Sequence, residues 1–294
     1  MSSINKPIAT LSKLEQLNFL MTNRIPRRWS TQFIGWFSKI RHPWVAKLSI
    51  FVWSLFAEDL RLKDAKKETF DSLQDCFIRE LKPGLRPIEH SPDIVTSPCD
   101  AIIGECGTIQ DNTVLQAKGF PYELNELIPD GALCNKYKNG TYITLRLKSS
   151  MYHRFHAPVD CHVNKVNYLS GDTWNVNPIA LKKVEKLFCK NERAIIELDT
   201  PHHAGSITLV PVAAILVASM KFHFLSEPLD MKYTGPNHIR CNADFNKGDQ
   251  MGYFQHGSTI IVFASKGYEL AQGIETGKRI NMGEALLTGH QSPA

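Results

Sequence analysis

From about residue 93 onward the chain is a succession of short apolar runs that are rich in β-branched residues and separated by turn residues. The clearest runs are "DIVTSPCDAIIGECGTI", "TYITLRL", "CHVNKVNYLSGD", "RAIIELDT" and "HGSTIIVFA". Runs of this length, bounded by Gly, Pro, Asn and Asp, are typical of β-strands. With 43% hydrophobic and 21% charged residues the composition is that of an ordinary folded protein. This part of the chain therefore predicts a β-rich core.

The first 60 residues have a different composition, because aromatic and basic residues are interleaved there. Four of the five tryptophans lie in this segment, at positions 29, 36, 44 and 53. Residues 1–50 hold eight Lys or Arg against the single Glu15, a net charge of +7. An apolar face with helical spacing is formed by Trp44, Val45, Leu48, Val52, Leu55 and Phe56. Such a face beside basic residues predicts a helix that lies on an anionic membrane surface.

Two alternatives to this membrane-surface helix have to be considered. One is a helix that spans the bilayer, but the longest stretch without a charged residue in this segment, Leu48–Ala57, has ten residues, whereas a helix needs about 20 to span a bilayer. The other alternative is an amphipathic helix pair that packs on a core of its own. The net charge of the whole chain is only +5, which does not predict a nucleic-acid partner.

The remaining pattern completes the predicted fold class, α+β, with a helical N-terminal membrane-associated region packed on the β-rich core. We expect the boundary between residues 1–90 and residues 91–294. Residues 60–82 read as a helix, residues 123–133 as a short helix, and residues 206–220 as a pair of buried strands. Seven scattered cysteines without a C-x-x-C spacing predict reduced thiols on the cytosolic side. The N-terminus has no secretory signal pattern.

Two histidines, His153 and His156, form an H-x-x-H in "MYHRFHAPVD", which could in principle hold a metal ion. A metal site would need further ligands, for which His162, His202, His203 and several acids are available. No H-E-x-x-H or C-x-x-C spacing selects among them, so we predict no metal. Two polar loop histidines remain the simple alternative, as does a turn-forming role for Asp100 between Pro98 and a strand.

Asp100, His156 and Ser258 occur in the order Asp, His, Ser, which is the order of the catalytic triad of subtilisin. A base that removes the serine proton and a carboxylate that orients the base would make Ser258 a nucleophile. A serine hydrolase is therefore one hypothesis. The nucleophile-elbow motif G-x-S-x-G is absent, however. The residues after Ser258 also favour a strand, whereas the nucleophiles of such hydrolases open helices.

A Gly-Ser bond that leads into a strand permits a second chemistry. An activated Ser258 hydroxyl can attack the carbonyl carbon of Gly257, which converts the amide to an ester. Loss of the Cα proton of Ser258 then expels the ester and leaves dehydroalanine, which hydrolyses with loss of ammonia to a pyruvoyl group. This ketone forms a Schiff base with a primary amine and accepts electrons during decarboxylation, as pyridoxal phosphate does in other enzymes.

The chain resembles the phosphatidylserine decarboxylase proenzymes of bacteria over nearly its whole length. Six segments in the order of that family carry the resemblance: "FIRELKPGLRPI", "SPCDAIIGECG", "YHRFHAPVD", "SGDTWNVNP", "NERAIIEL" and "KGDQMGYFQHGSTIIVF". Two features depart from the family pattern. His256 stands before Gly-Ser-Thr where the family usually has an apolar residue, and the segment around Pro211 has fewer glycines than usual.

The resemblance implies a self-processing lyase that converts phosphatidylserine to phosphatidylethanolamine and carbon dioxide in phospholipid biosynthesis. Cleavage between Gly257 and Ser258 would give a β chain, 1–257, and an α chain, 258–294, that remain together as a heterodimer. Ser258 would supply the covalent pyruvoyl cofactor, with His156 as base and Asp100 behind it. His153 would lie near the substrate head group.

The same resemblance implies a peripheral enzyme on the cytoplasmic side of the cell membrane, because the lipid substrate stays in the bilayer. Whether the chain forms a homo-oligomer is left open by the sequence. A non-catalytic module that binds membrane surfaces is the third hypothesis, beside the decarboxylase and the serine hydrolase.

Overall fold

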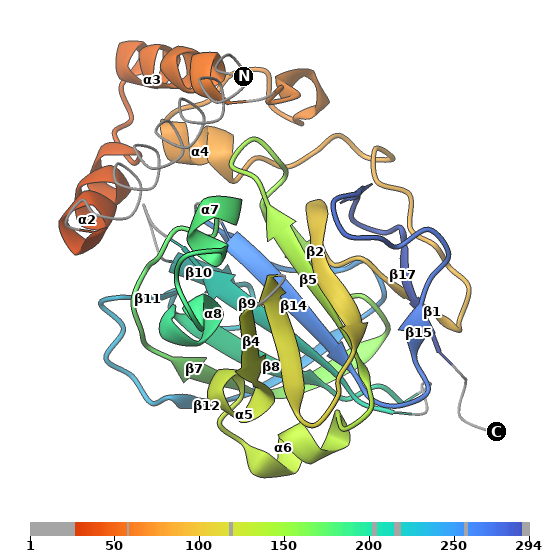
Figure 1. The fold of residues 1–294 in the computed structure, drawn as a ribbon. Coiled ribbons are helices and arrows are strands. Elements are labelled where there is room, and N and C mark those ends of the chain that lie inside the picture. The colour runs from red at the N-terminus through yellow and green to blue at the C-terminus, as the bar shows by residue number, and fades with distance from the viewer. Residues whose placement is uncertain are drawn as a thin grey trace, which may run out of the picture.

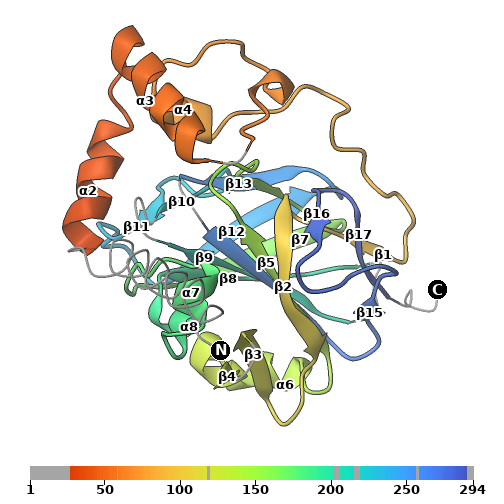
Figure 2. The same ribbon diagram turned by 45° about the horizontal axis from the view of Figure 1, so that its top comes forward.

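The computed structural model describes residues 27–57, 59–117, 120–201, 205–214, 219–255 and 258–289. An antiparallel sheet of eight strands runs through the middle of this part of the chain (Figures 1 and 2). In spatial order the strands are β12 (His238–Phe245), β7 (Cys161–Leu169), β8 (Arg193–Leu198), β9 (Ile207–Ala213), β14 (Ser258–Ala264), β5 (Thr141–Leu147), β2 (Ala101–Thr108) and β16 (Arg279–Ile280). The α+β class with a β-rich core is confirmed.

The apolar run after Ser258 is a central strand, as its composition predicts. β14 pairs in antiparallel register with β9 on one side and with β5 on the other. Side chains alternate between the two faces of a strand, so Ile260 and Val262 enter one core cluster while Ile261 and Phe263 enter the other. Both faces are buried, and therefore every second residue need not be polar.

Smaller sheets and short helices cover the two faces. The first face is packed against the four-stranded sheet β11 (Leu229–Asp230), β10 (Ser219–Phe222), β13 (Gln250–Phe254) and β6 (Arg154–His156), and against the three-stranded sheet β1 (Ile94–Thr96), β17 (Ala285–Thr288) and β15 (Glu269–Leu270). The second face is covered by β3 (Thr113–Ala117), β4 (Phe120–Glu123), α5 (Leu124–Leu127), α6 (Gly131–Lys136), α7 (Pro178–Leu181) and α8 (Leu187–Lys190). The predicted helix at 123–133 is thus two short helices.

Residues 206–220 form two buried strands, β9 and β10, but these strands do not pair with each other. β9 belongs to the eight-stranded sheet, whereas β10 pairs with β11 and β13 in the four-stranded sheet. The chain therefore changes sheets between them, across residues 215–218, which lie outside the described residues. A buried strand can pair with any neighbour that the topology provides, so apolar composition could not reveal the change.

The N-terminal part is helical, with α2 (Arg27–Phe37) and α3 (Pro43–Phe56) at one edge of the molecule (Figure 1). The prediction of one helix over residues 60–82 is wrong. That segment holds only the single turn η1 (Leu62–Asp64) and α4 (Leu73–Phe77). Its two ends pair instead, because Lys66 donates its backbone N–H to Glu80 and Lys82 donates to Asp64. Backbone groups used in this pairing cannot form helical hydrogen bonds.

Within the described ranges no helix is both long enough and apolar enough to cross a bilayer. All seven cysteines are free.

The buried Arg79 attaches this N-terminal segment to the core. Its guanidinium donates to the carbonyl oxygens of Leu60 at 2.8 Å, Cys76 at 3.1 Å and Ser150 at 2.9 Å. Arg79 is only 5% exposed, so these carbonyls have little access to water. One side chain therefore holds together the chain after α3, the end of α4 and the loop between β5 and β6.

We expect Arg79→Met to lower the stability of this attachment by about 3 kcal/mol, because each buried carbonyl left unpaired costs about 1–3 kcal/mol. Urea unfolding followed by tryptophan fluorescence measures it, since four of the five tryptophans precede residue 54. Lys82→Met is the control, because the Lys82 ammonium bonds the Lys63 carbonyl at an exposed position. Equal urea midpoints for Arg79→Met and Lys82→Met would contradict the assignment of Arg79 as the residue that attaches the N-terminal segment.

Candidate functional site

Ser258 is the first residue of β14, and its side chain is completely buried. Its backbone lies between Leu147 of β5 and Ala213 of β9. The hydroxyl oxygen has no hydrogen-bond partner among the described residues. Buried polar groups are nearly always paired, and an unpaired one has a structural cost that calls for a reason. His256 and Gly257, which precede it, lie outside the described residues.

Alternation along β14 places the Ser258 side chain on the same face as Ile260, toward the four-stranded sheet. The two histidines of the H-x-x-H motif belong to this layer. His156 is the last residue of β6, and the backbone oxygen of His153, just before that strand, accepts from the N–H of Phe254 in β13. Serine and histidines therefore lie on the same side of the large sheet.

Both ring nitrogens of His156 have hydrogen-bond partners. Nδ1 lies 2.8 Å from the carbonyl oxygen of Gly248, and Nε2 lies 3.0 Å from the hydroxyl of Tyr152. A carbonyl can only accept, so Nδ1 carries the proton and Nε2 accepts from Tyr152. Burial lowers the pKa of His156, an effect that the Gly248 bond partly offsets. Burial also raises the pKa of the Tyr152 phenol, which stays protonated. His156 is therefore a neutral imidazole whose basic nitrogen is held by a tyrosine.

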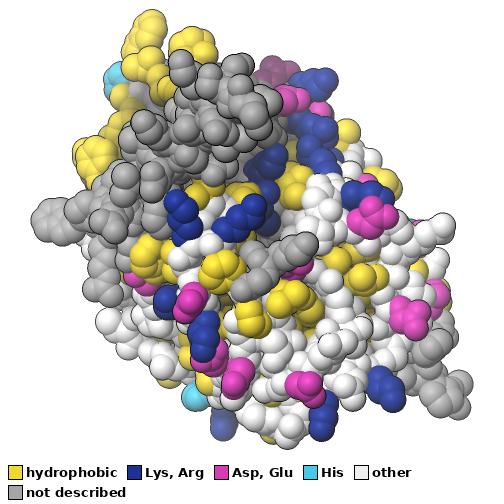
Figure 3. All heavy atoms as spheres, in the orientation of Figure 1, with side chains coloured by type: hydrophobic (Ala, Val, Ile, Leu, Met, Phe, Trp, Pro, Cys, Tyr) yellow, Lys and Arg dark blue, Asp and Glu magenta, His cyan; other side chains and the backbone are white. Residues whose placement is uncertain are grey.

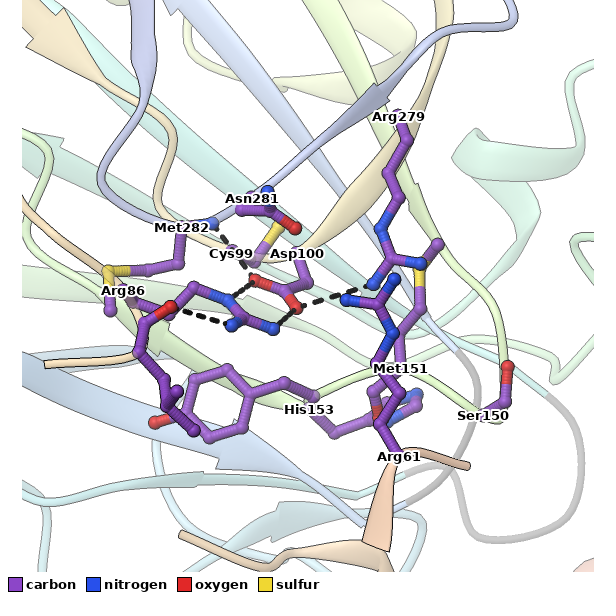
Figure 4. Close-up of polar contacts among 12 residues, drawn as sticks. Arg61, Arg86, Cys99, Asp100, Ser150, Met151, His153, Arg279, Asn281 and Met282 are labelled. Atoms are coloured by element: carbon purple, nitrogen blue, oxygen red, sulfur yellow. Dashed lines mark hydrogen bonds and ion pairs between the residues drawn. The ribbon is translucent and has the colours of Figure 1, made fainter. Parts of the chain in front are cut away.

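Asp100 precedes β2 and is fully buried, and its carboxylate is surrounded by donors (Figure 4). Arg86 binds both oxygens, with Nε 2.8 Å from Oδ1 and Nη2 on Oδ2. The backbone N–H of Met282 donates to Oδ1 at 3.0 Å, and Arg279 Nη2 lies 3.9 Å from Oδ2. The hydrogen bond with Asp100 raises the pKa of Arg86. The buried charge is thus compensated by a bidentate ion pair, the arrangement that burial of a carboxylate requires.

His153 connects this layer to the N-terminal helices. Its Nδ1 lies 2.8 Å from the carbonyl oxygen of Met151. Its ring centroid is 4.0 Å from that of Phe77 in α4, and Phe77 in turn stacks with Trp53 of α3 at 5.7 Å. A row of rings therefore runs from α3 to the histidine.

The predicted relay is not a closed chain of hydrogen bonds in this arrangement. Among the residues that the structure places, no hydrogen bond or ion pair joins Asp100 to His156, or His156 to Ser258. The charge of Asp100 raises the pKa of His156, against the larger lowering effect of burial. In these ranges no group of three or more His, Cys, Asp and Glu side chains is placed to hold a metal ion. His202 and His203 lie outside the described residues.

Sequence reasoning missed the two residues that bind the predicted relay members. Tyr152 directly precedes His153, and Arg86 lies in the segment "FIRELKPGLRPI", so both belong to segments that carry the family resemblance. Neither residue belongs to a recognised catalytic motif, so the sequence alone offered no reason to select it. Their roles depend on partners 4 and 14 residues away, which only the fold brings together.

Comparison with known proteins identifies a family. The family model for phosphatidylserine decarboxylase matches residues 73–288. A phosphatidylserine decarboxylase proenzyme of Haemophilus influenzae is 35% identical over 277 residues, which cover 89% of this chain and 92% of that protein. A proenzyme of the same description from Francisella tularensis subsp. novicida is 35% identical over 254 residues, 85% of this chain and 87% of that protein.

We expect Tyr152→Phe to raise the pKa of His156 toward its ordinary value, because the hydroxyl stabilises only the neutral ring. A histidine NMR titration of the full chain measures it, with the His156 signal assigned from its loss in His156→Gln. Tyr137→Phe is the control, since the Tyr137 hydroxyl bonds Thr208 instead. An unchanged or lower His156 pKa in Tyr152→Phe would show that the phenol does not donate to Nε2.

Proposed function

We propose that this chain, which belongs to the phosphatidylserine decarboxylase family, carries out that family's reaction with a pyruvoyl group made from its own Ser258. The reaction removes carbon dioxide from phosphatidylserine and leaves phosphatidylethanolamine, a step of phospholipid biosynthesis. The observation that carries the proposal is the buried Ser258 hydroxyl, unpaired among the described residues, at the first position of a central strand. Such a hydroxyl is desolvated and has no described bond that would compete with one to a base.

In the proposed maturation, the Ser258 oxygen attacks the Gly257 carbonyl carbon and the peptide becomes an ester. His156 takes the serine proton, and Asp100 stabilises the imidazolium that results. This role requires His156 Nε2 to exchange its bond with Tyr152 for one with Ser258. The lowered pKa of His156 supports the role, because the ring is unprotonated at neutral pH.

The residues around Ser258 fit a pyruvoyl group at this position. The unpaired hydroxyl oxygen would pass to the Gly257 carboxylate when the group forms, so residue 258 would no longer carry a buried hydroxyl without a described partner. When present, the group supplies a ketone that can bind the amine of the substrate and accept electrons as carbon dioxide leaves. We assign protonation of the substrate carbon to His156 and contact with the head group to His153. The buried position of His153, beside Phe77 and bonded to the backbone of Phe254, supports its assignment.

Cleavage at this bond would leave the two chains firmly associated. β14 is hydrogen-bonded along its whole length to β9 and β5, both of which belong to residues 1–257. Its side chains enter both core clusters. A heterodimer of residues 1–257 and 258–294 is therefore proposed as the mature enzyme.

We further propose that α2 and α3 attach residues 1–90 to an anionic membrane, with residues 91–294 as the catalytic core. Large apolar side chains on these helices face outward, and Figure 3 shows hydrophobic atoms gathered at this edge. They are Phe33, Trp36, Trp44, Leu48, Phe51, Val52, Leu55 and Phe56. The basic residues Lys39, Arg41 and Lys47 accompany them. Exposed aromatic side chains beside lysine and arginine suit the headgroup layer. We therefore propose a peripheral place for the chain, on the cytoplasmic side of the cell membrane.

We expect the purified protein to consist of two chains, residues 1–257 and 258–294. Denaturing mass spectrometry should find the smaller chain about one ammonia lighter than a serine-headed peptide. Ser258→Ala should remain one chain, because it has neither nucleophile nor pyruvoyl precursor. Ser258→Cys should cleave slowly, because a thiol can make the same acyl shift.

The same experiment separates the competing functions. A serine hydrolase would stay at 33.2 kDa and would be labelled at Ser258 by a fluorophosphonate. A binding module without catalysis would stay intact and unlabelled. Cleavage of Ser258→Ala between residues 257 and 258 would show that another group or a protease does the work.

We expect the double variant Trp44→Ser, Phe56→Ser to bind anionic vesicles at least tenfold more weakly than wild type. The two side chains are 78% and 86% exposed, and burial of a large apolar side chain contributes about 1.5–3 kcal/mol. Cosedimentation at low and high salt measures it, and salt should weaken binding without abolishing it. Leu115→Ser is the control, on an exposed apolar residue of β3. Equal binding by all three proteins would contradict the assignment of α2 and α3.

A further inference from the structure

A small cavity lies beside Asp100 and is lined mainly by charged residues. Its volume is about 90 Å³, and its walls include four arginines and three aspartates. The arginines are Arg61, Arg79, Arg86 and Arg279. They come from three stretches of the chain, so the fold has brought like charges together. Arg61 directly precedes η1, Arg79 and Arg86 lie between α4 and β1, and Arg279 begins β16. Counted by formal charge, the walls carry one positive charge in excess.

Two of the four guanidinium groups already have most of their hydrogen bonds. Arg79 donates through Nη1 and Nη2 to backbone carbonyls, while its buried Nε has no partner among the described residues. Arg86 uses Nε and Nη2 on Asp100, and Nη1 on the carbonyl of Leu85. These two arginines keep their charge, and most of their donor nitrogens are already bound to other groups. Their positive charges contribute to the electrostatic potential of the cavity. Direct binding of a ligand is left to Arg61 and Arg279.

The guanidinium groups of Arg61 and Arg279 have N–H donors that bind no described residue. Arg279 reaches Asp100 only at 3.9 Å, beyond hydrogen-bond distance, and Arg61 reaches Asp59 only at 4.0 Å. Neither side chain donates a hydrogen bond to any residue in the described ranges. Figure 4 shows both guanidinium groups directed to one side of the Asp100 carboxylate, with Arg86 on the other side.

The backbone at Arg61 supports a role for its side chain. Its φ of 46° and ψ of 44° lie in the left-handed region, which residues with a Cβ rarely adopt. Strained residues of this kind concentrate at ligand sites. Two guanidinium forks that face one small space match the oxygens of a phosphate group, which accepts paired N–H bonds.

We propose that this cavity binds a small oxyanion of the phosphate class between Arg61 and Arg279. The ligand would be free phosphate or the phosphodiester of a lipid head group, which share this chemistry. Its binding would relieve the repulsion between the two arginines without displacing Arg86 from Asp100. If the chain cleaves as proposed above, the anion would also join the two products, because Arg61 lies in 1–257 and Arg279 in 258–294. That consequence alone rests on the proposed function.

Isothermal titration of the full-length protein with inorganic phosphate, and separately with glycerophosphoserine, tests the proposal. We expect saturable binding of at least one of them. Tighter binding of inorganic phosphate would identify a free anion as the ligand, and tighter binding of glycerophosphoserine would identify a head group. No saturable binding of either would overturn the proposal. The titration is repeated on Ser258→Ala, so the result does not depend on cleavage.

Arg61→Gln and Arg279→Gln should each weaken binding about tenfold or more, since a charge-assisted hydrogen bond contributes about 1.5–3 kcal/mol and 1.4 kcal/mol is a factor of ten. Arg279→Lys should recover part of the loss, because it restores the charge without the fork. Lys278→Gln makes the same change of charge next to the site, on an ammonium paired with Glu275, and should bind like wild type. Equal weakening by Lys278→Gln would overturn the proposal in favour of general electrostatic attraction. Circular dichroism of each variant confirms that it is folded.

Discussion

The hydrogen-bond ladders on both sides of β14 are the constraint on which the rest of the structure depends. They fix the register of Ser258 against Leu147 and Ala213. A shift of one residue would move its side chain to the opposite face of the sheet, away from the layer that contains His153 and His156. The same ladders would keep residues 258–294 in place after a break in the chain before Ser258. One central strand therefore positions the proposed nucleophile and would hold the product chain.

Beside that strand, the buried Asp100 and the buried His156 each have their own set of hydrogen-bond partners. The two residues interact with each other only through charge. Asp100 is held by Arg86 and by the backbone of Met282, and His156 by Tyr152 and Gly248. Each set of partners satisfies the desolvated groups of its residue, which a buried carboxylate and a buried imidazole both require. The Ser258 hydroxyl has no such partner among the described residues. The proposed relay therefore needs a local rearrangement at Tyr152, and the tyrosine becomes a positioning residue for the histidine.

The N-terminal segment has opposite properties on its two sides. Trp53 stacks on Phe77, which lies against His153, while Trp36, Trp44 and Phe56 are exposed. An amphipathic helix pair with a closed core of its own would not leave so many aromatic rings outside. The segment thus touches the candidate site directly and presents its apolar surface outward, so the proposed membrane attachment would bring the bilayer close to the site.

The sequence alone determined the elements whose signals are local. Alternating or continuous β-branched runs predicted β14 and the β-rich core, and helical spacing predicted α3 within a helical N-terminal region. The motif segments predicted Ser258, His156, Asp100 and His153 as candidates, and the family that the comparisons identify. Residues 60–82 escaped this reasoning because the pairing of Lys66 with Glu80 is not visible in their helical spacing.

Only the tertiary structure decided which groups bind one another. Arg86 and Tyr152 acquire their roles through contacts with Asp100 and His156 that no spacing rule contains. The separation of β9 and β10 into different sheets is likewise a property of the topology. The physical reason is the same in each case. Periodicity reports which side of an element is buried, whereas a hydrogen bond or an ion pair needs a distance of about 3–4 Å, and such distances arise only when the elements pack.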